Sequence, residues 1–113
     1  MTNKEFSKLG VVLLDGGKYN DKQIVSEGYI KASITDIIST LNCGFEDSES
    51  NKGYGYQLWL CSYPGVYRAD GMYGQFSIVF PDKEAVITVT SHEENNANDI
   101  LRAIYKDIIP YLD

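Results

Sequence analysis

Alternating and apolar runs between Gly53 and Ser91 predict three β-strands, and the rest of the chain must cover or feed them. The expected strands are Tyr54–Cys61, Tyr73–Phe80 and Ala85–Ser91. The first alternates along its length, and period-two alternation with aromatic and β-branched residues is typical of strands. The third carries bulk on both faces, which predicts a central strand. The segment Pro81–Glu84 predicts a tight turn, so the last two strands form a hairpin.

Apolar residues at helical spacing predict two helices before this region. Thr2 and Glu5 have the spacing of a capping box, and a helix is expected from about Asn3 to Asp15. The glycine pair that follows favours a left-handed stop. Ser26 is a good cap for a second helix from Glu27 to about Ser33. Its apolar stripe continues, so this helix has the pattern to run on towards Thr40.

The connecting segments predict turns, short extended pieces and a closing helix. The polar segment Phe45–Lys52 indicates an exposed loop. We expect the last helix to begin near Asn96, which lies three residues before Asp99, and to end near Ile109, because Pro110 disfavours helical geometry before it. Its apolar stripe marks it as amphipathic. The remaining expectations are a turn at Asn20-Asp21, a short extended piece at Gln23–Val25 and a returning strand at Val66–Arg68.

Together these elements predict an α+β fold with an antiparallel sheet of three to four strands. The C-terminal helix is expected on one sheet face. The two N-terminal helices, or another chain, would cover the opposite face. A length of 113 residues predicts a single domain over residues 1–113 with a modest core.

Charge and composition restrict the classes of partner. The net charge of −6 argues against nucleic acid, because phosphate binding needs clustered Lys and Arg. No apolar run approaches the roughly 20 residues that span a bilayer. The start, Met1–Glu5, carries no apolar signal segment, which predicts a cytoplasmic protein or a piece of something longer.

Residues suited to metal or cofactor chemistry are sparse. His92 is the only histidine, and a lone histidine after a strand favours a surface position. No His/Cys cluster has the spacing of metal ligands, so no metal and no cofactor is expected. Cys43 and Cys61 are expected to be buried or partly buried free thiols, with a disulfide between them left open. Gly71 and Gly74 have either a packing role at a bulged strand start or a binding role, and the residues alone favour packing.

A resemblance to a known family changes that balance. Most of the chain is similar to the C-terminal part of the serine β-lactamase-like hydrolases, which include class C β-lactamases and penicillin-binding carboxypeptidases. The most specific matches are the Gly53-Tyr54-Gly55-Tyr56 entry and Gly71-Met72-Tyr73-Gly74-Gln75. The segment from Phe6 to Ser26, with its Gly-Gly-Lys turn at Gly16-Gly17-Lys18, also resembles the family. The resemblance implies a partial β-lactamase-like fold and substrates that are lactams, peptides, amides or esters.

The resemblance also implies a position for part of an active site. Family members carry a third motif, commonly Lys-Thr-Gly or His-x-Gly, on a sheet-edge strand that flanks the acyl group. Ala69-Asp70-Gly71 matches this motif by position, without Lys or His in the lead. The backbone N–H of Met72 would help to bind the oxyanion, and Gly71 would let the strand approach the substrate. The implied substrate-binding residues are Asp70, Gly71, Met72, Gly74 and Gln75.

The two other family motifs are missing from this sequence. No serine has a lysine three residues later, and no tyrosine has an asparagine or serine two residues later. The first interpretation is therefore a C-terminal hydrolase fragment that is inactive alone, with no catalytic residue of its own, whose parent family is often periplasmic or secreted. The second is a non-catalytic α+β domain that binds a protein partner through its sheet. A third, less favoured, is a hydrolase using Ser62, Ser77 or Ser91.

The expected partners follow from the first two interpretations. A sheet separated from the remainder of its hydrolase should leave apolar surface open, and large apolar patches drive association. We therefore expect a homodimer, or a complex with the N-terminal half of the hydrolase. No nucleic acid and no membrane span is expected.

Overall fold

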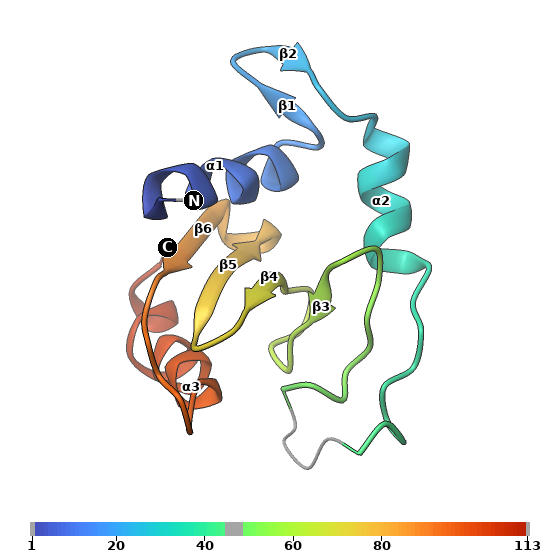
Figure 1. Cartoon of the computed structure of the whole chain (residues 1–113). Helices are drawn as coiled ribbons and strands as arrows, with labels where there is room; N and C mark the ends of the chain where they lie inside the picture. The colour runs from blue at the N-terminus through green and yellow to red at the C-terminus, as the bar shows by residue number, and fades with distance from the viewer. Residues whose placement is uncertain (1, 45–48, 113) are drawn as a thin grey trace.

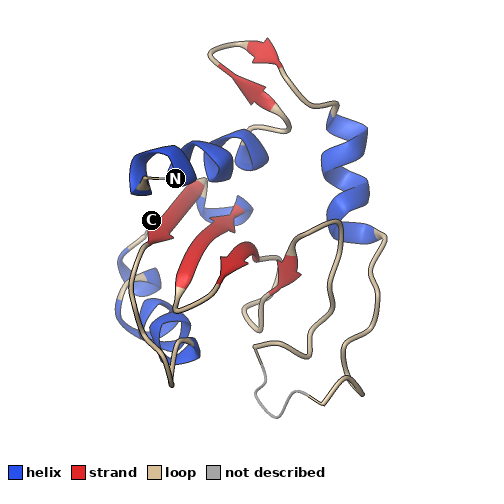
Figure 2. Ribbon diagram, in the orientation of Figure 1, coloured by secondary structure: helices blue, strands red, loops and turns tan. Residues whose placement is uncertain are grey.

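The computed structural model describes residues 2–44 and 49–112 of the chain. Its centre is a four-stranded antiparallel sheet in the order β3-β4-β5-β6, with every neighbour pair antiparallel. The strands are β3 (Trp59–Leu60), β4 (Tyr67–Gly71), β5 (Gln75–Phe80) and β6 (Ala85–Val89), and the helices are α1 (Asn3–Leu14), α2 (Glu27–Thr35) and α3 (Asn98–Asp107). Helix α2 stands apart from β5 and β6, near β3 (Figures 1 and 2). The expected α+β class is confirmed.

Helix α3 covers one face of the sheet and forms the larger core with it. Phe76, Ile78 and Phe80 alternate along β5 and are almost wholly buried. They pack with Leu101 and Ile104, one helical turn apart on α3. The 3-10 turn Ile109–Tyr111 then adds a buried isoleucine at its start. The amphipathic stripe read from the sequence therefore lies on the sheet, as expected.

Helix α1 covers the other face through a close contact at Gly10. A Cβ at Gly10 would lie 2.4 Å from Val86 Cγ1 and 2.6 Å from Ser77 Oγ. The helix backbone therefore rests almost directly on β5 and β6. Leu13 continues the contact beside the buried Val79. The N-terminal helices thus supply the expected cover, although α1 provides most of it.

Local signals at the N-terminus are confirmed in detail. Thr2 and Glu5 form a capping box at the start of α1, and Gly16 and Gly17 both have positive φ angles after it. The chain then forms a small hairpin, β1 (Lys18–Tyr19) with β2 (Lys22–Gln23). Its turn residues Asn20 and Asp21 have φ angles of 52° and 62°, which Asn and Asp tolerate better than most residues. Of the extended piece expected at Gln23–Val25, only Gln23 belongs to a strand, because β2 ends at that residue.

The expected strand Tyr54–Cys61 is wrong over most of its length. Only Trp59–Leu60 forms a strand, and Gln57 has a φ of 65°. The cause is packing against α2, because a Cβ at Gly55 would lie 1.8 Å from the carbonyl oxygen of Ser33. Tyr56 N–H donates to this same oxygen. Alternation predicted a straight strand, whereas close approach to a helix bends the chain.

Other expectations also need correction. Helix α2 does not run on to Thr40, since it ends at Thr35 and Ile38 instead exchanges backbone hydrogen bonds with Tyr54. Strand β6 lies at the sheet edge, and β5 is the buried inner strand. Helix α3 is capped at Ala97, without a side-chain hydrogen bond, and ends at Asp107.

The loop expected at Phe45–Lys52 lies partly outside the described residues, which omit 45–48. Its described part includes Glu49, which is buried rather than exposed. Among the residues that the structure describes, no helix has the length and apolar character needed to cross a bilayer.

Candidate functional site

The β4–β5 hairpin brings together the five residues that the sequence predicts for substrate binding. Asp70 and Gly71 end β4, and Gly74 and Gln75 lie at the start of β5, with Gly71 opposite Gln75 in the register. Met72 projects from the turn between them and is 77% exposed. Their shared location agrees with the sequence analysis. Their functional role stays a prediction.

The turn is held in shape by Ser91, which follows β6. Tyr73 and Gly74 have φ angles of 65° and 82°. The Ser91 hydroxyl lies 2.7 Å from the Tyr73 carbonyl oxygen and 2.9 Å from that of Gly74, and donates to them. The Gln75 amide donates to the Ser91 carbonyl oxygen. Because Tyr73 and Gly74 are left-handed, β5 begins at Gln75, two residues later than expected.

The two glycines of the motif differ in their surroundings. A Cβ at Gly74 would lie 2.5 Å from Ser91 Oγ and 2.7 Å from Ile100 Cδ1, so this glycine permits close packing as well as a positive φ. At Gly71 the nearest atom would be the Cβ of Gln75, at 3.1 Å. The packing interpretation therefore holds for Gly74. Gly71 lies in a less crowded part of the hairpin.

The outer edge of β4 is only partly paired. Strand β3 pairs with Tyr67 and Arg68 alone. Among the described strands, none pairs with Ala69–Gly71 on that side. Beyond the end of its neighbouring strand, a strand edge can present backbone N–H and C=O groups to an approaching segment. We call Ala69–Gly71, the part of β4 beyond its pairing with β3, the outer β4 edge.

Arg68 anchors Asp70 just behind this edge. Its side chain is fully buried, and Nε donates to Asp70 Oδ2 at 2.9 Å. Its other nitrogens donate to the carbonyl oxygens of Leu60 and Glu49 at 3.3 and 3.1 Å. Burial opposes the charge on Arg68, but Cys61 and Asp70 outweigh it and raise the pKa of the guanidinium. Asp70 is thereby held by a cation on its own strand.

The same polar cluster extends to α3 through Glu49. Ser62 Oγ and the Tyr105 hydroxyl both donate to the Glu49 carboxylate, at 2.5 and 3.3 Å. Burial raises the pKa of Tyr105, as it does that of the neighbouring Cys61 thiol. Since the thiolate is the nucleophilic form of cysteine, Cys61 is poorly suited to attack. The cluster joins four segments of the chain through the hydrogen bonds of Glu49 with Ser62, Arg68 and Tyr105.

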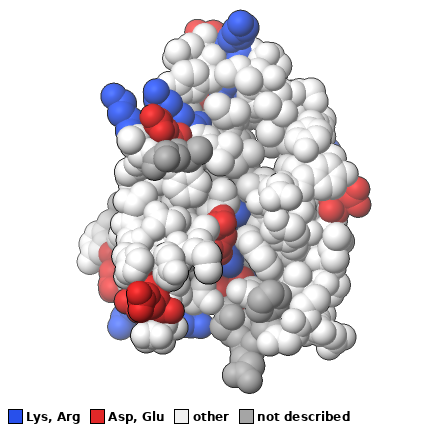
Figure 3. All heavy atoms as spheres, viewed as in Figure 1, with Lys and Arg blue, Asp and Glu red and all other residues white. Residues whose placement is uncertain are grey.

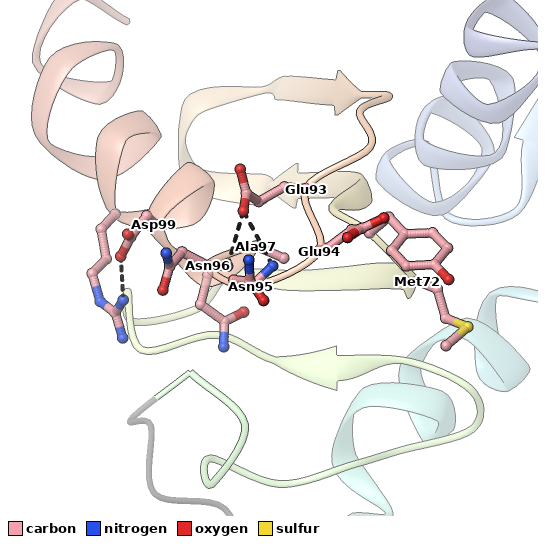
Figure 4. A pocket seen from close by; sticks show the side chains of 10 residues that line it. Met72, Glu93, Glu94, Asn95, Asn96, Ala97 and Asp99 are labelled. Atoms are coloured by element: carbon pink, nitrogen blue, oxygen red, sulfur yellow. Dashed lines mark hydrogen bonds and ion pairs between the residues drawn. The ribbon is translucent and has the colours of Figure 1, made fainter.

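A cavity of about 410 Å³ opens beside the β4–β5 turn. Met72 and Tyr73 form one side, and the loop before α3 with its first turn forms the other, from Glu93 to Arg102 (Figure 4). Glu93 accepts hydrogen bonds from the backbone N–H groups of Asn95 and Asn96, both at 3.2 Å. The lining is therefore mainly polar, with several carboxylates.

The start of α3 was not expected at this cavity. In the sequence, no helix start follows the glycine pair directly, yet folding brings Asp99 and Arg102 of α3 to the turn. These two side chains form an ion pair at 2.8 Å. About twenty-five residues separate them from Tyr73 in the sequence, so no local pattern signals the contact.

None of the three candidate serines is hydrogen-bonded to a histidine or lysine among the described residues. Ser62 bonds to Glu49, Ser77 to Thr88 and Ser91 to backbone oxygens. His92 stacks on Tyr73 with ring centroids 4.5 Å apart, and its Nε2 lies 3.1 Å from Glu94. A serine nucleophile needs a neighbouring base. The arrangement therefore gives no support to a serine hydrolase that is complete in these residues.

The two cysteines and the residue types that bind metals complete the description of the site. Cys61 is buried and Cys43 is exposed, and both are free, so the expected burial holds only for Cys61. Within residues 2–44 and 49–112, no three His, Cys, Asp or Glu residues gather as a metal site would require. His92 is on the surface, as expected.

Comparison with solved structures identifies a neighbour for this arrangement. The chain superposes on part of a protein described as "Putative 6-aminohexanoate-dimer hydrolase from Bacillus anthracis", with a TM-score of 0.71 and 24% sequence identity. The match covers 98% of this chain but 29% of that chain. The chain therefore has the fold of part of that hydrolase. No family model and no curated protein matches the sequence.

The hydrolase neighbour shows the fold and nothing more at this level of identity. The outer β4 edge, the glycine at its end and the cavity beside Met72 and Tyr73 are features of this chain's own structure. Any activity of the whole hydrolase therefore comes to this chain only as a proposal.

Proposed function

We propose that this chain is the C-terminal part of a β-lactamase-like serine hydrolase and forms one wall of its active site. The observation that carries this is the position of the outer β4 edge, Ala69–Gly71, which lies beyond the pairing with β3 and at the motif position that the resemblance predicts. The match to 29% of the hydrolase neighbour supports the role of a part. The nucleophilic serine and its base would come from a different segment of polypeptide.

In this proposal the wall acts through its backbone. The N–H of Met72 donates to the oxyanion of the tetrahedral intermediate, and preorganised donors of this kind stabilise developing charge. Gly71 carries no side chain, so the acyl group can lie against the strand. Arg68 acts as a positioning residue, because its bond to Asp70 fixes the end of β4. Gly74 and Gln75 hold the turn closed against Ser91.

The substrate class is an amide or ester bond next to this wall. The neighbour's name refers to a dimer of 6-aminohexanoate, and the family resemblance adds lactams, peptides, amides and esters. The cavity beside Met72 would receive part of such a substrate. Because its lining includes Glu93 and Asp99, we expect strongly anionic substrates to be disfavoured there.

A direct test starts with the chain alone. Purified protein incubated with nitrocefin and with nitrophenyl esters should show no turnover above the rate in buffer. Turnover that a single Ser→Ala change at Ser62, Ser77 or Ser91 abolishes would show a complete hydrolase and contradict the proposal.

A second experiment tests the chain within a complete hydrolase. A chimera that replaces the matching part of the hydrolase neighbour with this chain should hydrolyse 6-aminohexanoate dimer or a nitrophenyl ester. In the chimera, Met72→Pro removes the proposed donor and should lower kcat about 100-fold or more, whereas Met72→Ala keeps the N–H and should stay within about threefold. Equal activity of these two variants would remove Met72 from the oxyanion site.

The alternative of a non-catalytic binding domain rests on a different feature. Both faces of the sheet carry a helix, so partner binding through an open face has no support in the structure. An apolar hollow of about 490 Å³ does lie between α1 and α2, with Leu13, Ile30 and Ile34 on its walls. This hollow is the feature that favours a binding role.

A further inference from the structure

The turn between β4 and β5 contains a bulky residue in a conformation that such residues rarely adopt. Tyr73 has a φ of 65°, in the left-handed region, and Gly74 follows it with a φ of 82°. Glycine tolerates this geometry, whereas a tyrosine is strained by it and keeps it only where the surrounding structure fixes the backbone. Groups outside the turn must therefore hold Tyr73 in place.

The segment after β6 holds the turn through Ser91 and Glu93. The Ser91 hydroxyl donates to the carbonyl oxygens of Tyr73 and Gly74, at 2.7 and 2.9 Å. The backbone N–H of Glu93 donates to the same Tyr73 oxygen at 2.9 Å. In return, the side-chain amide of Gln75 donates to the Ser91 carbonyl oxygen. We call these hydrogen bonds, with Ser91 at their centre, the Ser91 clamp.

The Ser91 clamp is attached to well-packed parts of the fold. Ser91 follows β6, whose five residues pair in regular register with β5. A Cβ at Gly74 would lie 2.5 Å from Ser91 Oγ and 2.7 Å from Ile100 Cδ1, so the absence of a side chain lets the hydroxyl reach the backbone of the turn. Ile100 in turn packs against the core cluster of the α3 face. The turn is thus held from the sheet and from the helix.

We propose that Ser91 is a positioning residue for the Met72 N–H, the oxyanion donor of the proposed function, on which this inference rests. Met72 lies between Gly71, which pairs with Gln75 at the end of the strand ladder, and Tyr73, whose carbonyl oxygen is held by the clamp. Because both neighbours of Met72 are fixed, the direction of its N–H is fixed with them. Such a donor must be oriented before the reaction, since a displacement of about 1 Å can cost about 100-fold in rate.

The hydroxyl of Ser91 acts in this proposal through the backbone and not on the substrate. Its single proton is shared between two carbonyl oxygens, neither of which is a base that could activate it as a nucleophile. Loss of the hydroxyl frees the turn but removes no group from the cavity wall formed by Met72 and Tyr73. The expected result is a slower reaction with little change in substrate binding.

The test uses the chimera in which this chain replaces the matching part of the hydrolase neighbour. Ser91→Ala should lower kcat about tenfold or more and leave KM within about threefold, because the orientation of the donor matters in the transition state. Ser91→Thr keeps the hydroxyl and should keep kcat within about threefold of the unmodified chimera. The matched control is Ser33→Ala, which removes a buried hydroxyl that donates to the Ile30 carbonyl oxygen on α2, and kcat should stay within about twofold.

The outcomes separate this inference from the proposed function. A folded chimera without activity, or equal activity of Met72→Pro and Met72→Ala, would overturn the proposed function and this inference together. A loss of kcat in Met72→Pro without a loss in Ser91→Ala would overturn the inference alone. Equal losses in Ser91→Ala and Ser91→Thr would do the same, because the hydroxyl would then not be the cause.

Hydrogen exchange in the chain by itself keeps the inference falsifiable if the chimera folds poorly. The Glu93 amide reports on the clamp, since it donates to the Tyr73 carbonyl oxygen. In Ser91→Ala this amide should exchange about fivefold faster or more, whereas in Ser33→Ala it should exchange at the rate of the unmodified chain. An unchanged rate in Ser91→Ala would show that the hydroxyl does not hold the turn, and would overturn the inference.

Discussion

The two faces of the central sheet are closed by different means. On the α3 face, eight buried residues from β5, α3 and their neighbours form one cluster, which adjoins the fully buried Arg68. On the α1 face, the buried cluster has five residues, and the helix gains its contact through a glycine. A hollow of about 490 Å³ remains there between α1 and α2. The α3 face therefore has the larger buried cluster, whereas the α1 face keeps a hollow beside its smaller one.

The difference follows from side-chain volume at the two interfaces. Phenylalanine and leucine fill the space under α3, and close packing of large apolar groups contributes most of a core's stability. Under α1, Gly10 and Ser77 bring two backbones together without filling a thick layer. Helix α2 contributes Ile30 but stands beyond the sheet (Figure 1). On the surface, charged side chains are sparse over the right half of the molecule, where α2 lies in Figure 1 (Figure 3).

The largest expected effect tests the α3 face through its buried cation. Arg68→Ala removes the buried guanidinium that donates to Asp70 and to the Glu49 carbonyl oxygen, and breaking a buried pair costs about 3–5 kcal/mol in the free energy of unfolding. Arg102→Ala is the control, because its pair with Asp99 is exposed and should cost less than about 0.5 kcal/mol. Urea denaturation measures both. Similar losses for the two variants would show that the Arg68 cluster stabilises no more than a surface pair.

The next effect compares apolar residues from the two faces. Leu101→Ala on the α3 face should lower the free energy of unfolding by about 4 kcal/mol, and Ile30→Ala on the α1 face by about 2 kcal/mol. Leu101 is fully buried, whereas Ile30 borders the hollow and has fewer contacts to lose. Denaturation midpoints at constant m-value give both numbers. A larger loss for Ile30→Ala would reverse the ranking of the two faces.

The sequence predicts the parts of this fold that depend on local pattern. The capping box at Thr2, the glycine stop of α1, the β5–β6 hairpin and the stripe of α3 are all confirmed. The strand expected over Tyr54–Cys61 fails because Gly55 packs on the Ser33 carbonyl, a contact between residues 22 positions apart. Alternation of apolar and polar residues predicts which side chains face the core, but it does not predict where contact with a helix bends the chain.

The candidate site shows the same division. The family resemblance predicted five neighbouring residues together, and the hairpin keeps them together: Asp70, Gly71, Met72, Gly74 and Gln75. The opposite wall of the cavity, from Glu93 to Arg102, comes from the loop before α3 and carries no local signal of its role. The polar composition of its segment predicted that Glu49 would be exposed. It is buried because it bonds to Ser62 and Tyr105, which are distant in sequence and give no local signal. Site residues that lie in one segment can be predicted from that segment of sequence. A cavity formed by two distant segments can be identified only once the fold is known.

The smallest effect sharpens the comparison at the α1 face itself. Gly10→Ala adds a Cβ within 2.4 Å of Val86 Cγ1, and the stiff, β-branched valine has little room to move. Overpacking of about 1–3 kcal/mol should exceed the roughly 1 kcal/mol gained in helix propensity, so the protein becomes less stable by about 1 kcal/mol. Gly28→Ala in α2 meets nothing within 4 Å and should stabilise by up to about 0.5 kcal/mol. Thermal unfolding of both variants measures the sign. Stabilisation by Gly10→Ala would mean that α1 and β6 leave room for a methyl group at Gly10. The α1 face would then be less tightly packed than the α3 face even at its closest contact.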